Sequence, residues 1–477
     1  MIFNLLFIPE IILSIGVMII IVVDLFLQSH KGITFKFIQL LLLLSGYYSI
    51  NGQVSSIYQS YELSEFLNVI KFILLFGSFI IFHYTYKHLK YLNNLKIEYF
   101  TISILGLIGT MIMISANSML MLYLGIELLS LSLYALIGFN KNSSLSSEAA
   151  IKYYVLGAMS SGILLFGISL IYGFTGSIIY SDIAEVINAI EMNSVEYLGI
   201  IFGIVFITAS LCFKFGAAPF HMWVPDIYQG SLVSTTTLLS TLPKIAVFIV
   251  FLKLYYIPFI SMKSMWSDIL LFVGMLSIVI GSIFALTQTN IKRLLAYSAI
   301  SNIGFIILAL GLVSNEGIQA SLYYTIVYSL TALASFGIIT HITCNSHGIE
   351  KISDLSGLSQ THPYYAILIL ITMLSSAGIP PMIGFHAKLI VITALIDSSY
   401  IILSVIVVIM TVISAYYYLK IIKTIYFDSR EDLISVYSNG SLILSLNSIS
   451  LLILGIFPYY LFNLSSYLMG LLFAISI

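Results

Sequence analysis

Charge is the scarcest property of this sequence. Only 8% of its 477 residues are Asp, Glu, Lys or Arg, whereas 60% are hydrophobic. A soluble globular domain carries about 25% charged residues, so this composition excludes a soluble protein. The formal net charge of -1 provides no electrostatic attraction to nucleic acid. The sequence therefore predicts a protein that is surrounded by lipid and has no nucleic-acid partner.

Cysteine and the common cofactor motifs are also missing or rare. The two cysteines, Cys212 and Cys344, stand in apolar surroundings without a CxxC or Cys/His spacing, which argues against a disulfide framework or a metal site. The sequence has no glycine-rich nucleotide-binding motif, no helical pair of haem-binding histidines and no iron–sulfur cysteine set. We therefore expect no cofactor and no metal in this chain, so energy for any ion movement must come from elsewhere.

Long apolar runs take the place of these motifs. A membrane-spanning helix needs about 20 apolar residues, and this length predicts fourteen spans. The predicted spans are residues 2–28, 34–50, 69–87, 99–115, 117–138, 149–172, 197–217 continuing to 229, 231–256, 268–287, 294–312, 317–342, 363–397, 400–425 and 440–470. Because no Pro/Ser-rich linker separates the spans, the prediction is an all-α polytopic membrane protein with a single membrane domain, 1–477.

Basic residues are distributed unequally between the two sides of the predicted membrane. Thirteen of the nineteen lie in loops after odd-numbered spans or at the adjoining span ends: Lys31, Lys36, Lys87, Lys90, Lys96, Lys141, Lys152, Lys292, Arg293, Lys351, Lys420, Lys423 and Arg430. The other loops hold Lys263, with Lys71 and Lys253 near span ends. Because basic loops stay on the cytoplasmic side, the odd-numbered loops are predicted to face the cytoplasm or mitochondrial matrix, and both termini the opposite side.

Three basic residues remain deep inside predicted spans, namely Lys214, Lys244 and Lys388. All three are lysine. An arginine stays charged under nearly any condition, whereas burial can bring the pKa of a lysine into a range where it exchanges protons. The residue type therefore favours a proton carrier over a voltage sensor. The alternative for each lysine is a side chain that extends to the membrane interface.

Two of these lysines lie beside helix-breaking sequences. Lys214 precedes Pro219, and Lys388 follows the pair Pro380 and Pro381. A helix broken at membrane depth beside an ionisable group is a common construction at ion pathways. The lysine stands before the proline in one case and after it in the other, as an inverted repeat produces. We therefore predict two inverted five-helix repeats, about 99–256 and 268–425, with broken helices 7 and 12 and with flanking helices in 1–98 and 440–470.

An acidic residue, Glu127, stands at the midpoint of the predicted span 117–138. A charged carboxylate there costs about 2.5–3.5 kcal/mol unless it is protonated or paired. We interpret Glu127 as a proton site whose partner is Lys214 or Lys244 on another helix; the alternative is a structural acid bonded to a neighbouring helix. His221, inside the first break, either caps freed backbone carbonyls or relays protons.

Four sequence motifs resemble those of a known family. Residues 213–230 read FKFGAAPFHMWVPDIYQG, 127–134 read ELLSLSLY, 290–298 read NIKRLLAYS, and 377–385 read AGIPPMIGF. They are similar to the antiporter-like membrane subunits of respiratory complex I, and within that group to the N-type branch. The resemblance implies fourteen helices and assigns proton transfer to Glu127, Lys214, Lys244 and Lys388. Pro243, directly before Lys244, departs from the family pattern and leaves the geometry of that helix open.

The resemblance also implies a function. The chain is expected to be a proton-translocating membrane subunit of NADH:ubiquinone oxidoreductase, without a redox centre of its own. NADH, FMN, iron–sulfur clusters and ubiquinone are then expected in partner subunits, within a hetero-oligomer of complex I membrane subunits in a lipid bilayer. Abundant Ile, Phe, Tyr and Asn favour the mitochondrial inner membrane over a bacterial plasma membrane. The alternative function is that of an Mrp-type cation/proton antiporter subunit.

Overall fold

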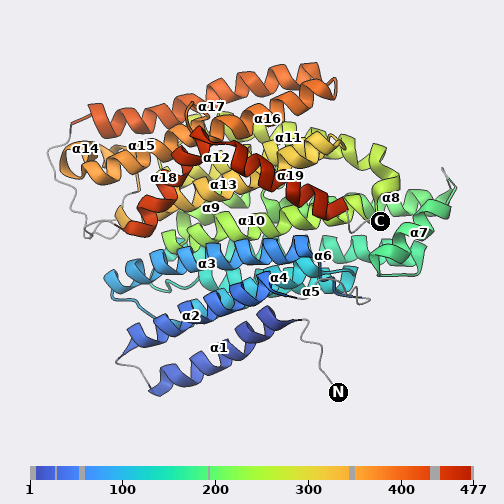
Figure 1. Cartoon of the computed structure of the whole chain (residues 1–477), viewed down its shortest axis with the longest axis horizontal. Coiled ribbons are helices and arrows are strands. Elements are labelled where there is room, and N and C mark those ends of the chain that lie inside the picture. Colours follow the sequence, from blue (N-terminus) through green and yellow to red (C-terminus); the bar gives the residue numbers. More distant parts are fainter. Residues whose placement is uncertain are drawn as a thin grey trace. The chain divides into compact units, whose positions relative to one another are not determined.

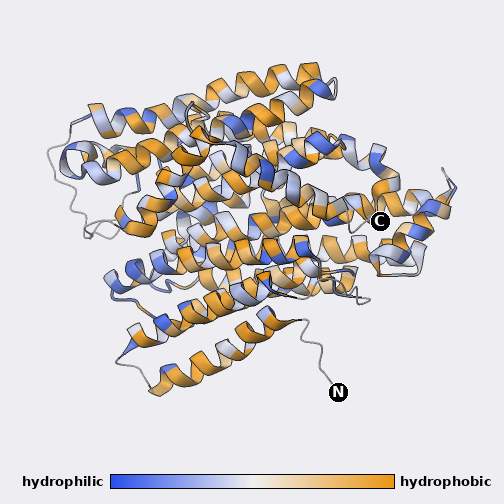
Figure 2. Cartoon of the chain, viewed as in Figure 1, coloured by the Kyte–Doolittle hydropathy of each residue, from blue (hydrophilic) through white to orange (hydrophobic). Residues whose placement is uncertain are grey.

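The computed structural model describes residues 7–26, 30–52, 60–191, 194–342, 350–429 and 441–473. Within these residues nearly all of the chain is helical, and no strand is present (Figure 1). Apolar residues run along the helices, and hydrophilic residues gather mainly towards helix ends and connections (Figure 2). The predicted all-α polytopic architecture is confirmed. Cys344 and Arg430 lie outside the described residues.

Twelve helices of the described chain are long and apolar enough to cross a membrane. They are α1 (Ile8–Phe26), α2 (Lys31–Ile50), α3 (Glu65–Tyr91), α4 (Ile97–Ser115), α5 (Met119–Ile137), α6 (Ser144–Thr175), α8 (Val195–Phe215), α10 (Val233–Tyr256), α11 (Lys263–Leu286, extended at its start by the 3-10 turn η1, Ile260–Met262), α12 (Ile291–Leu310), α13 (Asn315–Ile342) and α17 (Ile401–Phe427). The shorter elements are α7 (Tyr180–Ala189), α9 (Trp223–Gly230), η2 (Ile352–Leu355) and α14 (Leu358–Thr361).

Three predicted spans are each built from two helices, and the first of them, 197–229, consists of α8 and α9. The predicted span 440–470 consists of α18 (Leu442–Ile456) and α19 (Tyr459–Phe473), bent by 88° with respect to each other. This pair raises the number of candidate spans in the described chain to thirteen if it crosses as one. The predicted span 363–397 consists of α15 (Pro363–Ala377) and α16 (Ile383–Asp397), each of 15 residues. The count of fourteen spans stays a prediction.

The chain packs as two compact units. The first comprises Met1–Lys214, Leu242–Lys263 and Leu471–Ile477, and the second comprises Phe215–Thr241 and Ser264–Gly470. In the first unit α2 packs on α1 and α3, and α4 packs on α5 (Figure 1). In the second unit α13 packs on α12, α15 and α16. The predicted single domain and the repeat boundaries at 99–256 and 268–425 remain predictions.

Both predicted helix breaks are present. α8 ends at Phe215, and α9 begins only at Trp223; α15 ends at Ala377, and α16 begins at Ile383. A glycine with positive φ follows each helix end, Gly216 at +81° and Gly378 at +80°. Glycine adopts this conformation without the steric cost that a Cβ imposes, and it commonly ends helices. Inside the first break, the Ala218 backbone N–H donates to Ser277 Oγ at 2.8 Å, so a backbone donor freed by the break is satisfied.

Pro243 does not break its helix. α10 runs from Val233 to Tyr256 through the proline. All of its residues from Val233 to Tyr255 are buried. A proline inside a helix removes one backbone hydrogen bond and usually kinks the helix. In this protein α10 nevertheless stays one continuous helix, and Lys244 lies at its middle.

A backbone layer closes one end of the first unit. Glu62 N donates to Ser115 O at 2.8 Å, and Asn117 N donates to Ser60 O at 2.9 Å. On its other side, Tyr180 N donates to Asn117 O at 3.2 Å. We call residues 60–62, 115–119 and 178–180 the closing layer. It joins the chain before α3, the α4–α5 junction and the start of α7, and therefore lies where α3 and α5 begin and α4 ends.

Candidate functional site

Glu127 lies on α5 and is half-buried within this chain. Its carboxylate oxygen Oε1 accepts a hydrogen bond from Ser161 Oγ, which α6 provides. α5 and α6 pack against each other, and this packing places the serine opposite the acid. Glu127 is therefore bonded to a neighbouring helix, as both interpretations of this residue require.

Lys214 lies one residue before the end of α8 and is 9% exposed. Its ammonium donates to Ser130 Oγ at 2.8 Å and to Ser161 Oγ at 3.4 Å. Ser161 thus contacts both Lys214 and Glu127. Since the lysine is held by groups inside the unit, it does not extend to a membrane interface.

Lys244 is the third charged residue of this group, on α10 and 1% exposed. Its ammonium donates to the backbone carbonyl oxygen of Lys214 at 3.4 Å. That carbonyl belongs to the last turn of α8, where carbonyls lack intrahelical partners and the helix dipole is negative. The first unit therefore brings Glu127, Lys214 and Lys244 into one connected group.

Lys388 belongs to the second unit, where it lies on α16 and is 7% exposed. Its ammonium donates to Ala377 O at 2.9 Å and to Ser414 Oγ at 3.5 Å, and lies 5.9 Å from the centre of the Phe305 ring. Ala377 is the last residue of α15. At each break, a carbonyl at the C-terminal end of a helix accepts a hydrogen bond from a lysine ammonium. The donor is Lys244 at the first break and Lys388 at the second.

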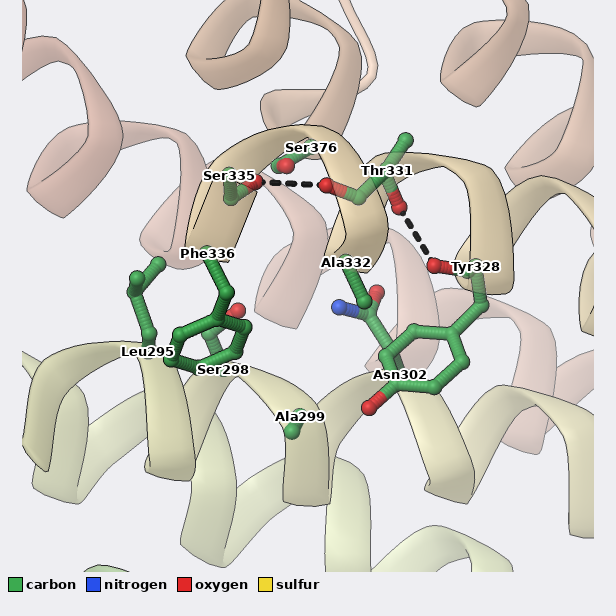
Figure 3. Close-up of a pocket in the computed structure, with 10 residues that line it drawn as sticks. All are labelled: Leu295, Ser298, Ala299, Asn302, Tyr328, Thr331, Ala332, Ser335, Phe336 and Ser376. Carbon is green, nitrogen blue, oxygen red and sulfur yellow. Dashed lines mark hydrogen bonds between the residues drawn. The ribbon is translucent and has the colours of Figure 1, made fainter. Parts of the chain in front are cut away.

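A small polar cavity lies between α12 and α13 of the second unit (Figure 3). Its volume is about 20 Å³, which is enough for a water molecule. Its lining is Leu295, Ser298, Ala299, Asn302, Tyr328, Thr331, Ala332, Ser335, Phe336 and Ser376. Asn302 accepts a hydrogen bond from the Tyr324 hydroxyl at 2.8 Å, and Ser298 bonds to the Tyr418 hydroxyl at 2.5 Å. Hydroxyl and amide groups of three helices therefore surround a space that water can occupy.

The three consecutive tyrosines of α17 do not act together. Consecutive tyrosines in a membrane protein are typical of an aromatic belt at the membrane interface, and this is the interpretation that the sequence favours for all three. Tyr416 is 63% exposed, which fits that interpretation, whereas Tyr417 and Tyr418 are each 1% exposed. The interpretation is wrong for the two buried residues, because the helix turns them inward, where Tyr418 bonds to Ser298.

The histidines occupy different environments. His221 is buried inside the first break, where its ring has a hydrogen bond with the Pro219 backbone; this is a contact that the capping of freed carbonyls requires, and proton relay stays a prediction. His341 Nδ1 lies 2.9 Å from Gly337 O within α13. His386 Nε2 lies 3.1 Å from Gly455 O of α18, whereas Lys388 donates to Ala377 O and Ser414 Oγ.

The sequence reasoning missed two classes of residue. The first is the hydroxyl pair Ser130 and Ser161, although Ser130 lies three residues after Glu127, on the same helical face. The second is a set of ion pairs: Lys71 Nζ lies 2.8 Å from Glu10 Oε1, and Lys253 Nζ lies 2.7 Å from Glu62 Oε2. Both lysines had been interpreted as lying near span ends. They do lie near the ends of α3 and α10, but they are buried and paired with acids from other segments.

The group in the first unit can move a proton in one concerted step. Ser161 Oγ accepts from the Lys214 ammonium while it donates to the Glu127 carboxylate. If Lys214 gives a proton to the serine oxygen as the serine gives its own proton to Glu127, the hydroxyl is regenerated. The products are a neutral amine and a neutral carboxylic acid. The arrangement is thus able to interconvert a charged pair and a neutral pair.

Comparison with known proteins identifies the family of this chain. The family described as "NADH:quinone oxidoreductase/Mrp antiporter, TM" matches residues 116–414. NADH-quinone oxidoreductase subunit N of Ruthia magnifica subsp. Calyptogena magnifica is 41% identical over 464 residues, which are 96% of either chain. The protein of the same name from Pelagibacter ubique is 38% identical, covering 96% of this chain and 97% of its own length.

Solved structures share the fold over nearly the whole chain. A chain of respiratory complex I from Thermus thermophilus with bound Aureothin is 25% identical with a TM-score of 0.79, and the match covers 95% of this chain and 98% of that one. A chain of the Mrp complex from Dietzia sp. is 19% identical with a TM-score of 0.80, covering 97% of both. The second similarity concerns the fold alone.

Proposed function

This chain belongs to the family of NADH:quinone oxidoreductase and Mrp antiporter membrane subunits, and from this premise we propose that it works as the N-type, proton-translocating membrane subunit of a respiratory NADH:quinone oxidoreductase. Its partners are the other membrane subunits of that complex. The relatives named above carry the subunit N name over almost their full length, which supports the N-type assignment. NADH, FMN, the iron–sulfur clusters and the quinone belong to partner subunits in this proposal.

The observation that carries the proton role is the serine shared by an acid and a lysine. Lys214 and Glu127 meet at Ser161, and Lys244 donates to the backbone of Lys214. A change of charge near Glu127, driven by quinone reduction elsewhere in the complex, alters the affinity of Lys214 for its proton. Coupling of this kind requires two states with different proton affinity. Lys388 is the proton site of the second unit in this proposal.

Replacement of Lys214 tests the proton role. In the assembled complex, Lys214→Met removes the ammonium and keeps an unbranched side chain of similar length. We expect proton pumping, measured with a pH-sensitive dye in proteoliposomes, to fall at least tenfold, together with NADH-driven quinone reduction. Unchanged pumping and quinone reduction in an assembled Lys214→Met complex would rule out the proton role and leave a structural subunit.

The matched control is Lys263→Met. Lys263 is exposed at the start of α11, so its replacement removes the same charge from the chain without touching the buried group. Pumping and quinone reduction are expected to stay at the wild-type level in this variant. An equal loss in both variants would assign the effect to net charge.

The alternative function, an Mrp-type cation/proton antiporter subunit, uses an ion gradient and has no redox partner. The family description covers both classes. Purification of the tagged chain from its native membrane distinguishes them. Flavin and iron–sulfur subunits co-purify with an N-type subunit, whereas only other antiporter subunits accompany an Mrp-type chain.

We propose an energy-converting membrane as the location, with the basic loops on the matrix or cytoplasmic side and both termini on the other side. Composition favours the mitochondrial inner membrane. The named relatives are bacterial, which favours a bacterial plasma membrane. The genome that encodes the chain decides between the two, and the orientation is the same in either case.

A further inference from the structure

A second buried group of charges lies at the closing layer of the first unit. The Lys71 ammonium lies 2.8 Å from Glu10 Oε1 and donates to the Tyr61 hydroxyl at 2.7 Å. The Tyr61 hydroxyl donates to the same Glu10 oxygen at 2.7 Å. We call Glu10, Tyr61 and Lys71 the outer triad. Its members come from α1, from the closing layer and from α3.

A second ion pair stands beside the outer triad in the sequence but is held differently. Lys253 pairs with Glu62, the residue after Tyr61, at 2.7 Å. The Lys253 ammonium also donates to two backbone carbonyls, Ala116 O at 2.8 Å and Ile114 O at 3.2 Å. Backbone carbonyls accept hydrogen bonds but take up no proton, so they favour the charged lysine. In the outer triad, by contrast, Lys71 contacts two side chains whose oxygens can each take up and pass on a proton.

A gain in stability is a weak explanation for the outer triad. Lys71 is 1% exposed and Glu10 is 5% exposed. Removing two charges from water costs several kcal/mol per ion, and replacing a buried ion pair by apolar side chains of similar volume is often neutral or stabilising. Glu10 Oε2 is buried and has no hydrogen-bond partner among the described residues. An acid with a free, buried oxygen has a position where a proton can be held.

The position of the outer triad fits a place on a proton route. Glu127 is the ninth residue of α5 and therefore lies about 12 Å along the helix from the end that the closing layer covers, at 1.5 Å per residue. Lys71 is the seventh residue of α3, whereas Glu10 is in the first turn of α1. Lys71 thus lies deeper in the unit, and Glu10 lies nearer the end at which α1 and α3 begin.

We infer that the outer triad is a proton-release site, through which a proton leaves the first unit after it has passed the Glu127–Lys214 group. The Lys71 ammonium gives one proton to Glu10, directly or through the Tyr61 hydroxyl, and becomes a neutral amine. Glu10 releases that proton outward and becomes a carboxylate again. Lys71 takes its next proton from the interior, so one proton crosses per cycle and no other reactant is needed. This inference rests on the proposed function and names its exit.

Lys71→Arg tests the release site in the complete complex. Arginine keeps the positive charge and the ion pair with Glu10, but it is not deprotonated in proteins. We expect the complex to assemble and the number of protons pumped per electron to fall at least fivefold. A Lys71→Arg complex that assembles and pumps at the wild-type ratio would overturn the inference.

Lys253→Arg is the matched control, because Lys253 is also buried, paired with an acid and close to the same layer. It is expected to pump normally, since its proton does not move. Equal losses in the two variants would assign the effect to the size of arginine and overturn the inference.

A double variant covers the case in which Lys71→Arg does not assemble. Glu10→Gln with Lys71→Met removes both charges and leaves no unpaired ion. We expect this double variant to assemble and to lose proton release. Normal pumping in the double variant, or failure of both variants to assemble, would make the triad a structural pair and overturn the inference.

Lys214→Met, measured beside these variants, separates the two proposals. Loss of pumping in Lys214→Met with normal pumping in Lys71→Arg contradicts the release site alone. Normal pumping in Lys214→Met contradicts the proposed function, and the release site with it.

Discussion

Ser161 is the residue on which the group in the first unit depends. Its hydroxyl donates to Glu127 and accepts from Lys214. It therefore connects, through hydrogen bonds, an acid and a base that lie on different helices. A hydrogen bond to a charged group contributes about 1.5–3 kcal/mol. The loss of this one hydroxyl therefore weakens the contact of both charged residues without changing the net charge of the chain.

Ser161→Ala is expected to reduce proton pumping about tenfold or more, because about 1.4 kcal/mol corresponds to a factor of ten. Assembly should change little, since one small side chain replaces another. The measurement is the initial rate of acidification in proteoliposomes with NADH and a quinone.

Ser160→Ala is the control for Ser161→Ala. Ser160 is its sequence neighbour, is also buried, and bonds to Ser210 Oγ at 3.0 Å. Its loss removes a neutral hydrogen bond only, so pumping should stay close to the wild-type rate. If both alanine variants pump normally, a water molecule or a direct contact joins Glu127 to Lys214, and the serine has no part in the transfer.

At the scale of single residues, the sequence identified the charges but not the groups between them. Glu127, Lys214, Lys244 and Lys388 stand out because an ionisable residue in an apolar run has a high free-energy cost. Ser130 and Ser161 do not stand out, because serine hydroxyls in helices satisfy themselves on the carbonyl one turn earlier. Only the packing of α5, α6 and α8 identifies the hydroxyls that contact the charged groups.

At the scale of helices, the spans that contain α8 and α15 share one kind of contact, between a lysine ammonium and a carbonyl at a helix C-terminus. Lys244 donates to the carbonyl of Lys214 at the end of α8, and Lys388 donates to that of Ala377 at the end of α15. Helix C-termini present unpaired carbonyls with partial negative charge. Each break therefore provides a backbone carbonyl that stabilises a buried lysine ammonium. The sequence had associated Lys214 with the first break, whereas the structure gives the carbonyl contact to Lys244.

Replacement of Gly378 tests the contact between Lys388 and the end of α15. A Cβ at this position would lie 2.8 Å from Lys388 Cδ, and the backbone φ is +80°. Gly378→Ala is expected to lower the stability of the complex by more than the cost of about 1–2 kcal/mol that a left-handed φ imposes on an L-residue, and to reduce pumping because Lys388 is displaced. Thermal inactivation in detergent and acidification of proteoliposomes measure the two effects.

Gly176→Ala separates backbone strain from displacement of the lysine. Gly176 has a φ of +71°, and nothing lies within 4 Å of its Cβ position. This variant should show the backbone cost alone, with normal pumping. If Gly378→Ala behaves like Gly176→Ala in both assays, Lys388 does not depend on its place beside the end of α15.

The interruption of the third two-helix span, between α18 and α19, also has a signal in the sequence. α18 ends at Ile456 and α19 begins at Tyr459, and Pro458 stands between them. Proline ends or kinks a helical pattern near the preceding residue, which predicts the interruption. The angle of 88° depends on tertiary packing, because a proline limits the local backbone but does not set the direction of the next helix.

For the whole molecule, the distribution of lysine and arginine predicts the orientation in the membrane. Lys141 is exposed in the α5–α6 connection, and Glu185 is exposed on α7, in connections on opposite sides. In a variant whose two native cysteines are replaced, Lys141→Cys should react with a membrane-impermeant maleimide only from the matrix or cytoplasmic side. Glu185→Cys should react only from the other side. The reverse pattern would invert the proposed topology and place the outer triad at a proton entrance.

The structure of the α7 region differs in part from what its sequence predicts. The acidic residues between Asp182 and Glu196 predict a solvated surface. This stretch contains α7, whose Ile183 and Ile187 are buried, while Asp182 and Glu185 are exposed. One face of this helix thus covers the first unit, and only the other face matches the prediction.

The sequence by itself determined the membrane environment, the all-helical class, the two breaks and the rarity of charges inside the spans. These are local properties: apolar length, proline position and the cost of a charge in lipid act on each segment separately. The tertiary structure decided which charges meet. Glu10 finds Lys71, Glu62 finds Lys253, and Glu127 finds Lys214 through a serine. A contact between helices that are far apart in the sequence depends on their packing and rotation, which no single segment contains.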